Sequence, residues 1–292
     1  MQYRLRHRTT YKYSQPVIAS HHVSHMVPRH TDFQSSTEDR IFIDPEPGIS
    51  VERRDYFGNM TRHFTVQQKH TKLVVEITSN VSVQPVPHLY PEQSVTWENA
   101  RDSLPGDLTP LGLAAFQYAF ASWHVTPSRE MADYARVSFT HRRPILEAAM
   151  DLTARIFHEF TFDKKATEVS TPIQTVLQNK RGVCQDFAHL MIGCLRSLGL
   201  AARYVSGYIR TITPPGEVRL EGSDASHAWC SVYCPGLGWV DLDPTNNLVA
   251  GDQHVTLGWG RDFADVSPLR GVILGGGKHK VSVAVDLIPA EG

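Results

Sequence analysis

The chain has 292 residues, of which 41% are hydrophobic and 20% are charged, proportions that suit a folded globular protein of one or two domains. A formal net charge of -1 gives no electrostatic reason to expect binding to nucleic acid or to an anionic membrane. Four cysteines are too few for a disulfide scaffold, and the first residues contain no apolar run typical of a secretion signal. We therefore expect a cytoplasmic protein that neither spans nor binds a membrane.

The first part of the chain has the pattern of β-strands. Residues 3–13 and 70–83 alternate between apolar and polar side chains, and residues 56–60 carry a turn signal between two polar strands. No helical periodicity occurs before about residue 90, where several prolines mark the exit from this region. The sequence therefore predicts a small antiparallel β-domain of sandwich type over residues 1–88.

Three histidines lie close together in this region, at His21, His22 and His25. In a strand His21 and His25 would share one face and His22 would lie on the other, and no thiol or carboxylate accompanies them. We interpret them as surface histidines and not as a metal site.

The middle of the chain changes to helical periodicity. Residues 111–123 and 129–135 indicate short helices, Pro144 begins a longer one, and residues 173–179 indicate a further short helix. We expect these helices to bury the helix that follows them.

That next helix begins close to Cys184. Its apolar residues recur at steps of three and four, at Phe187, Leu190, Met191, Cys194, Leu195 and Leu198, and Gly199 supplies a left-handed stop. A thiol in the first turn faces unpaired backbone N–H groups and the positive end of the helix dipole, and both favour the thiolate. On position alone, Cys184 is either a nucleophile or a small buried residue, whereas Cys194 lies in the apolar stripe and should be inert.

After Gly199 the pattern changes to strands. Residues 202–209 are β-branched and aromatic, residues 213–226 form a polar loop, and residues 227–233 and 239–243 flank a hairpin loop. Three glycines at 275–277 indicate a turn within a closing hairpin, which we expect to extend the sheet of the core.

The first of these hairpins offers an imidazole with a carboxylate partner. Pairing Tyr233 with Trp239 places His227 and Asp243 on one face as diagonal neighbours, with Cα atoms roughly 7–8 Å apart. Asp241 shares that face, so geometry leaves the choice of carboxylate open, with a preference for Asp243 at the end of its strand. A thiol, a base and a residue that orients the base form the arrangement that activates a cysteine nucleophile.

Together these segments closely resemble the bacterial transglutaminase-like superfamily. The resemblance rests on Gly182-Val183-Cys184-Gln185-Asp186-Phe187-Ala188, on residues 202–208, on Ser226-His227-Ala228-Trp229 and on residues 239–245. In that family Cys, His and Asp occur in this order on a helix start and two successive strands of a papain-like core. The resemblance implies that Cys184 is the nucleophile, His227 the base and Asp243 the orienting carboxylate, since Asp243 begins the family's Asp-Pro-Thr match. The opening β-region also resembles the N-terminal domain of many bacterial members.

The chain departs from animal members of the family in the surroundings of the cysteine. Residues 160–183 contain no tryptophan to donate to the oxyanion, so the Cys184 backbone N–H is the donor that the sequence places. Gln178 has the spacing of the oxyanion-hole glutamine in papain-like proteases, but we interpret it as a solvent-facing helix residue. No acidic calcium loop is evident, so we expect neither a metal nor another cofactor.

Other residues near the site have simpler interpretations. His189 lies roughly 140° around the helix from Cys184, which makes it a poor base for that thiol. Asp186 should cap or brace the helix start. Cys230 and Cys234 have no second pair of ligands at the spacing of a zinc finger.

The sequence thus predicts an α+β protein with a β-domain over residues 1–88 and a papain-like core over residues 89–292. The expected function is cysteine-dependent acyl chemistry on a peptide or protein amide. Hydrolysis is the first hypothesis because the polar loop 213–226 should leave water near the thioester, and Trp229 would form only one wall of a cleft. Transfer to an amine, as in a transglutaminase, is the alternative, and a non-catalytic peptide-binding module is the third.

Overall fold

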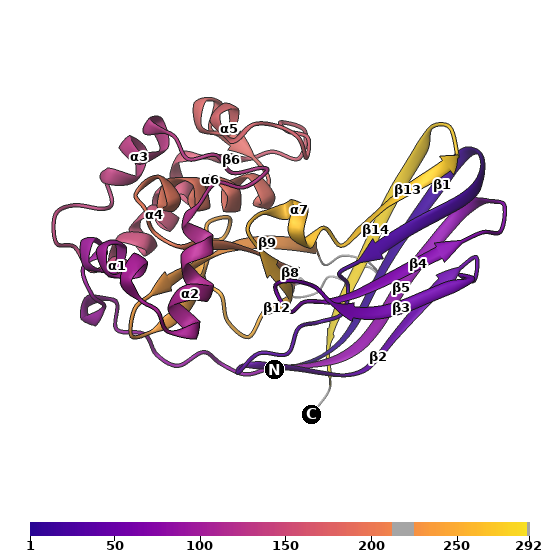
Figure 1. Cartoon of the computed structure of the whole chain (residues 1–292), viewed down its shortest axis with the longest axis horizontal. Coiled ribbons are helices and arrows are strands. Elements are labelled where there is room, and N and C mark those ends of the chain that lie inside the picture. The colour runs from indigo at the N-terminus through magenta and orange to yellow at the C-terminus, as the bar shows by residue number, and fades with distance from the viewer. Residues whose placement is uncertain (212–224, 291–292) are drawn as a thin grey trace, which may run out of the picture.

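One long strand organises the N-terminal lobe. β1 (Gln2–Ser24) alternates buried and exposed side chains along much of its length, as a strand does when one face lies in a core. In the computed structural model, which describes residues 1–211 and 225–290, β1 runs through a lobe made of strands, and the helices lie in the other lobe (Figure 1).

The N-terminal lobe is one antiparallel sheet built around β1. Its other strands from this part of the chain are β2 (Gln34–Asp44), β3 (Ile49–Arg54), β4 (Met60–Val66) and β5 (His70–Val83), in the order β2-β5-β1-β4-β3. The first half of β1 pairs with β5 and the second half with β4. Val17 of β1 lies in one apolar cluster with Phe64 of β4 and Leu73 of β5. The antiparallel β-domain predicted from the sequence is therefore confirmed.

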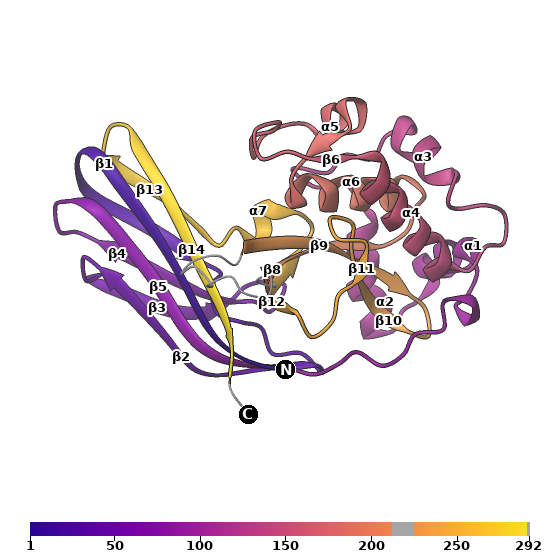
Figure 2. The same cartoon turned by 180° about the vertical axis from the view of Figure 1, so that it is seen from behind.

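The two closing strands belong to this lobe. β13 (Leu269–Gly275) pairs with residues 17–24 and β14 (His279–Pro289) with residues 3–13, and both views show them beside β1 (Figures 1 and 2). The prediction of a closing hairpin that extends the core sheet is wrong, because both strands run antiparallel to β1, one after the other, and pair with β1 and not with each other. The physical reason is that β4 and β5 satisfy only one edge of β1, and β13 and β14 supply backbone partners for the other. The domain boundary at about residue 88 stays a prediction. The N-terminal lobe also contains β13 and β14 from the end of the chain.

Two of the three neighbouring histidines are buried, in contrast to the surface position expected for them. His22 stacks on Phe64 with ring centroids 4.9 Å apart, and burial lowers its pKa to about 4. His25 lies beyond the end of β1, where its Nδ1 donates to the Ser267 carbonyl. Only the position of His21, which is exposed, agrees with the prediction.

Short helices form the shell of the second lobe. They are α1 (Trp97–Ser103), α2 (Pro110–Phe116), α3 (Arg129–Arg136), α4 (Ile145–Glu159), α5 (Ile173–Asn179) and α7 (Phe263–Val266), with 3-10 turns at Pro91–Gln93, Leu104–Gly106 and Gln117–Ala119. The helices expected from residues 111, 129, 144 and 173 are present, although α2 ends earlier than predicted. α1 was not expected; the Thr96 hydroxyl caps it by accepting the Asn99 N–H. None of the helices in the described ranges is both long and apolar enough to cross a bilayer.

The core of the second lobe is helix α6 (Cys184–Ser197) packed on a five-stranded antiparallel sheet. The strands are β8 (Ala202–Ile209), β9 (Ala225–Cys234), β10 (Gly238–Asp243), β11 (Leu248–Val249) and β12 (His254–Gly260), in the order β11-β10-β9-β8-β12. The predicted pairing of Tyr233 with Trp239 is confirmed, and Gly199 has the left-handed φ of 80° expected at the helix end. The sequence did not lead us to expect β12.

The two lobes share an apolar cluster. Tyr3, Leu5, Val81, Val83, Val285 and Leu287 from the first sheet pack with Tyr208, Val255 and Leu257 from the second. The contact therefore involves β8 and β12 of the core sheet, on the side away from β11.

Candidate active site

Cys184 is the first residue of α6. The chain reaches it through the short strand β7 (Arg181–Gly182), which pairs with β6 (Thr161–Phe162). The carboxylate of Asp186 accepts the Val183 N–H at 2.8 Å and the Thr167 hydroxyl at 2.6 Å, so the bracing role predicted for Asp186 is confirmed. This cap fixes the turn from strand to helix, and the backbone N–H groups of the first turn have no acceptor within the helix itself.

The four thiols have different surroundings. Cys184 is partly exposed, whereas Cys194, Cys230 and Cys234 are buried. Burial raises the pKa of Cys194 and of Cys234 to about 12, and raises that of Cys230 as well. The three buried cysteines lie in the apolar core, where they act as small packing residues.

His227 and Asp243 meet across the hairpin. The His227 Nε2–H donates to Asp243 Oδ2 at 2.7 Å, and both side chains are buried. Asp241 is occupied elsewhere, because its Oδ2 accepts the Trp229 Nε1–H at 2.9 Å. The structure therefore brings the imidazole to Asp243 and not to Asp241.

The imidazole also interacts with the thiol. Burial opposes a charge on His227, but hydrogen bonds with Asp243 and Cys184, together with their charges, raise the pKa of His227 to about 9. Since Nε2 is taken by Asp243, Nδ1 is the ring nitrogen that remains for the thiol. Cys184, His227 and Asp243 thus form a connected row.

Asp243 is the most heavily hydrogen-bonded member of the row. Its Oδ1 accepts the backbone N–H groups of Thr245 and Asn246, and its Oδ2 accepts the Asn246 amide and the Nε2–H groups of His227 and His254. Burial would raise the pKa of Asp243, but the hydrogen bonds from His227, His254 and Asn246 hold it well below the usual range. The carboxylate is therefore ionised and fixed in one orientation.

Sequence reasoning missed two of these partners. Asn246 follows Asp243 by three residues in a turn, a position from which its amide folds back onto the carboxylate. His254 begins β12, and only the alternation of the run after it could have indicated a strand there. Nothing in the sequence connects His254 to Asp243, because the contact depends on the order of strands in the sheet.

Side-chain atoms of His227, Asp243 and His254 converge within 4.8 Å, as they do in many metal sites. Their hydrogen bonds account for the arrangement without an ion. The Gly251 N–H donates to His254 Nδ1 at 3.3 Å, so the neutral ring carries its proton on Nε2 and donates it to Asp243. We therefore treat the cluster as a hydrogen-bonded network.

Three further expectations concern residues around the row. His189 is buried and its Nε2 accepts the Phe263 N–H, so it is a structural residue as predicted. Gln178 is exposed, which confirms its solvent-facing interpretation. Trp229 is fully buried and forms no wall of a cleft, which corrects that suggestion. The loop 213–226 lies outside the described residues except for its last two positions.

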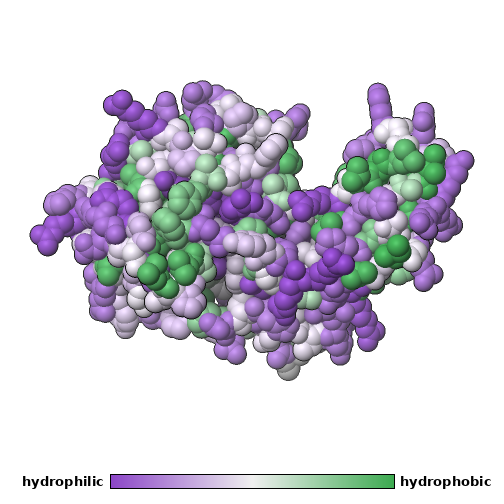
Figure 3. Space-filling view, viewed as in Figure 1, coloured by the Kyte–Doolittle hydropathy of each residue, from purple (hydrophilic) through white to green (hydrophobic). Residues whose placement is uncertain are grey.

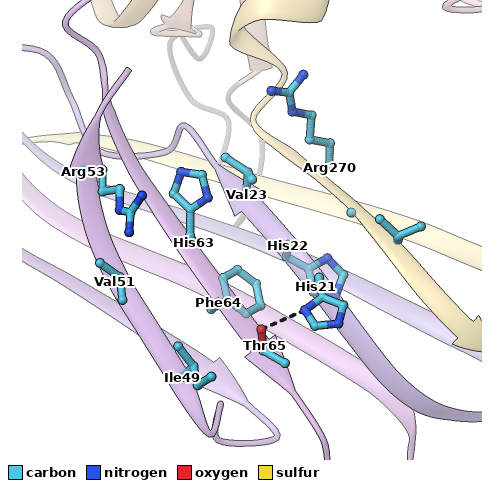
Figure 4. A pocket seen from close by; sticks show the side chains of 12 residues that line it. His21, His22, Val23, Ile49, Val51, Arg53, His63, Phe64, Thr65 and Arg270 are labelled. Atoms are coloured by element: carbon cyan, nitrogen blue, oxygen red, sulfur yellow. Dashed lines mark hydrogen bonds between the residues drawn. The ribbon is translucent and has the colours of Figure 1, made fainter. Parts of the chain in front are cut away.

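A separate cavity of about 560 Å³ opens on the N-terminal sheet. It is lined by exposed aliphatic residues of β3 and β13 and by Arg53, Arg270 and His63, and His21 is hydrogen-bonded there to Thr65 (Figure 4). Hydrophobic residues also gather near the end of this lobe on the face shown in Figure 3. The cavity contains no thiol or carboxylate side chain among its lining residues, so it is not part of the row around Cys184.

Two family models match the chain. Residues 3–82 match the bacterial transglutaminase-like N-terminal region, and residues 133–244 match the transglutaminase-like superfamily. The second match includes Cys184, His227 and Asp243.

Several known proteins are similar to the chain. An uncharacterized protein of Mycobacterium tuberculosis is 40% identical over 299 residues, which cover 99% of this chain and 93% of that protein. A protein-glutamine gamma-glutamyltransferase of Pseudomonas aeruginosa is 29% identical over 154 residues, which cover 49% of this chain and 23% of that protein. The crystal structure of a putative cysteine protease from Cytophaga hutchinsonii has a TM-score of 0.76 at 20% identity, over 100% of this chain and 92% of that one, and shows the same fold.

Proposed function

The chain belongs to the transglutaminase-like superfamily, and from this premise we propose that it is a cysteine-dependent enzyme that hydrolyses amide bonds in peptides or proteins. The observation that carries the proposal is the position of His227. Its ring is hydrogen-bonded to a buried carboxylate on one side and to a partly exposed thiol at a helix start on the other. This is the arrangement of a nucleophile, its base and the residue that orients the base.

The mechanism follows from these contacts. His227 takes the proton of the Cys184 thiol, and the sulfur forms a bond to the carbonyl carbon of the substrate. The backbone N–H groups at the start of α6 stabilise the negative charge on the carbonyl oxygen. When the C–N bond breaks, the imidazolium gives its proton to the leaving amine, and Asp243 keeps the ring in the required tautomer. Water, deprotonated by His227, then attacks the thioester and releases the acid.

Burial of Trp229 supports water over an amine as the acceptor. Transfer requires a site that holds an amine beside the thioester and keeps water away, for which aromatic walls are suited. Trp229 was the aromatic residue expected beside the imidazole; its ring centroid lies 6.1 Å from that of His227, but the side chain is fully buried with its Nε1–H on Asp241. It therefore shields no thioester.

Transfer to an amine is the second candidate. It is favoured by the similarity of about half of this chain to a protein-glutamine gamma-glutamyltransferase. In that case the same Cys184 thioester would be attacked by a primary amine, with His227 accepting the proton.

One experiment distinguishes the two acceptors. The protein is incubated with a glutamine-containing peptide and a labelled primary amine at millimolar concentration, with Cys184→Ala as the control. We expect release of ammonia and a hydrolysed peptide as the main product, absent in the control. More labelled conjugate than hydrolysed peptide would replace hydrolysis with transfer. Peptide binding by both proteins with no product from either would support the third candidate, a peptide-binding module.

The acyl group of the natural substrate can be read directly. Brief incubation with a cell extract, followed by acid quenching, should leave part of the protein as a thioester on Cys184, detectable by mass.

We also propose a cytoplasmic location, which the four free thiols support.

A further inference from the structure

The site contains a second histidine that the mechanism above does not use. His254 is buried, its Nδ1 accepts the Gly251 N–H, and its Nε2–H donates to Asp243 Oδ2 at 3.1 Å. The ring also stands edge-on to Trp229, with centroids 5.2 Å apart. Both ring nitrogens are therefore engaged, and the side chain has one tautomer and one orientation.

His254 lies on β12, the edge strand of the core sheet. An edge strand has backbone N–H and C=O groups with no neighbouring strand to pair with them. In β12 the pairing with β8 has an irregularity between Thr256 and Gly258, and the backbone groups of Thr256 and Trp259, on either side of it, bond to side chains outside the sheet. These groups face the N-terminal lobe.

Two side-chain amides of that lobe take the place of the missing strand. The Gln34 amide donates to the Thr256 carbonyl at 2.8 Å and accepts the Thr256 N–H at 2.7 Å. The Asn59 amide donates to the Trp259 carbonyl at 2.9 Å and accepts the Trp259 N–H at 3.0 Å. Each amide satisfies one donor and one acceptor of the strand, as a paired strand would.

The Asn59 side chain is itself fixed by Asp55 and Arg29 of the N-terminal lobe. Asn59 is fully buried and also donates to Asp55 at 2.8 Å, while Arg29 donates to the Asn59 carbonyl oxygen and lies over the Trp259 ring at 3.6 Å. Gly258 permits the close approach, because a Cβ there would lie 2.6 Å from the Asn59 side chain. The N-terminal lobe thus holds the outer edge of β12, whose inner edge pairs with β8.

We propose that His254 is a positioning residue of the active site, and that the N-terminal lobe holds it there through Gln34 and Asn59. His254 shares Oδ2 of Asp243 with His227, so it neutralises part of the carboxylate charge. Less of that charge is left to hold the proton on His227. The catalytic meaning of this sharing rests on the proposed function, in which the imidazolium must give its proton to the leaving amine.

Loss of the His254 donor therefore changes the proton affinity of His227. Within residues 1–211 and 225–290, the charged or titratable groups that act on His227 are Cys184 on α6, Asp243 on β10 and, through Asp243, His254 on β12. Asp243 keeps its orientation without His254, because Thr245 and Asn246 still donate to it. Its charge is then concentrated on His227, and the pKa of His227 rises further above about 9.

An NMR titration of the His227 ring in the full chain tests the role of His254. We expect His254→Phe, which keeps an aromatic ring beside Trp229 but has no donor, to raise the His227 pKa by roughly half a unit to one unit. His254→Gln, whose amide can donate to Asp243, should restore the original value. A His227 pKa that is unchanged or lowered in folded His254→Phe would overturn the role of His254.

The role of the N-terminal lobe is tested with Gln34→Met and Asn59→Leu, which keep the shape of each side chain and remove its amide. We expect faster hydrogen exchange at the Thr256 and Trp259 amides and a rise in the His227 pKa in the same direction as for His254→Phe. Asn80→Leu, which removes an exposed amide of the same lobe, is the matched control and should change neither. The Arg29 backbone N–H also donates to the Thr256 carbonyl at 3.0 Å and remains in both variants. Unchanged exchange and an unchanged pKa in folded Gln34→Met and Asn59→Leu would therefore show that these two amides do not hold His254.

These readouts do not depend on turnover, so they decide the proposal separately from the proposed function. If no amide is hydrolysed, the titration still shows whether His254 acts on His227. If an amide is hydrolysed, His254→Phe should lower kcat by about tenfold with little change in KM, because proton delivery to the leaving amine slows.

Discussion

The two sides of the active site are built in different ways. On the thiol side, Cys184 is held by contacts that are short in sequence: Asp186 caps the helix start, and Thr167 supports Asp186. On the imidazole side, His227 depends on Asp243, Asp243 on His254, and β12 on side chains of the other lobe. The Thr256–Gln34 hydrogen bond in that chain of contacts joins residues 222 positions apart.

The difference teaches where each side is vulnerable. The start of α6 is capped by residues close to it in the sequence. The thiol side should therefore tolerate changes elsewhere in the molecule. The imidazole side exists only when several strands and both lobes are assembled. Apart from loss of Cys184 itself, we therefore expect substitutions on the imidazole side to have the larger effects on chemistry, and those that support the thiol to act mainly on stability.

The largest effect should come from the carboxylate on the imidazole side. Asp243→Asn removes the charge and holds the wrong tautomer of His227, so we expect turnover of an amide substrate to fall by about 10⁴ with the fold intact. Asp241→Asn keeps an acceptor for Trp229 and should lower turnover far less. Steady-state kinetics of both variants checks the expectation. A larger loss in Asp241→Asn would move the orienting role to Asp241.

Thiol reactivity compares the two sides without a substrate. Iodoacetamide at neutral pH should label Cys184 at least ~1,000-fold faster than Cys194 or Cys234, because a pKa raised to about 12 leaves those thiols almost fully protonated. Mass spectrometry of peptides from folded protein measures the four rates. Similar labelling of all four cysteines would contradict the assignment of Cys184 as the nucleophile.

The imidazole side should also make stability depend on pH. The His227 pKa is about 9 in the folded protein against 6.5 for an unperturbed histidine, so the folded state binds this proton more tightly. The resulting stabilisation is complete below pH 6.5 and is lost as the pH rises to about 9, a decrease of up to about 3 kcal/mol in the free energy of unfolding. Urea unfolding at several pH values measures it. Asp243→Asn should flatten the curve over this range, and an equally steep curve in that variant would assign the effect to another group.

The sequence predicted the thiol side and the hairpin because both depend on local patterns. The spacing from Phe187 to Leu198 defined the helix, and the pairing of Tyr233 with Trp239 followed from a short loop. Choosing Asp243 over Asp241 required the family's Asp-Pro-Thr pattern. The structure adds a physical reason, since Asp241 is taken by Trp229.

What the sequence did not predict depends on contacts between distant segments. The two closing strands were expected to pair with each other and to extend the core sheet, because they follow that sheet in the chain, but both pair with β1. His254 was overlooked for the same reason: its role arises from strand order and from Gln34 and Asn59. The buried position of Trp229 likewise depends on strand order, because its ring reaches across Gly207 of β8 to His254 on β12.

The smallest effect should come from the cap on the thiol side. Asp186→Ala removes the acceptor of the Val183 N–H and the Thr167 hydroxyl, and we expect it to lower the free energy of unfolding by about 1 kcal/mol. Burial raises the pKa of Asp186, so its charge is disfavoured there, and Asp186→Asn should cost less because its amide oxygen still accepts. Urea midpoints measure both variants, and Thr167→Val is the control that removes only the supporting hydroxyl. Because the cap is local, the titration of His227 should stay unchanged in Asp186→Ala. A shift in that titration as large as the one expected for His254→Phe would show that the two sides of the site are not built independently.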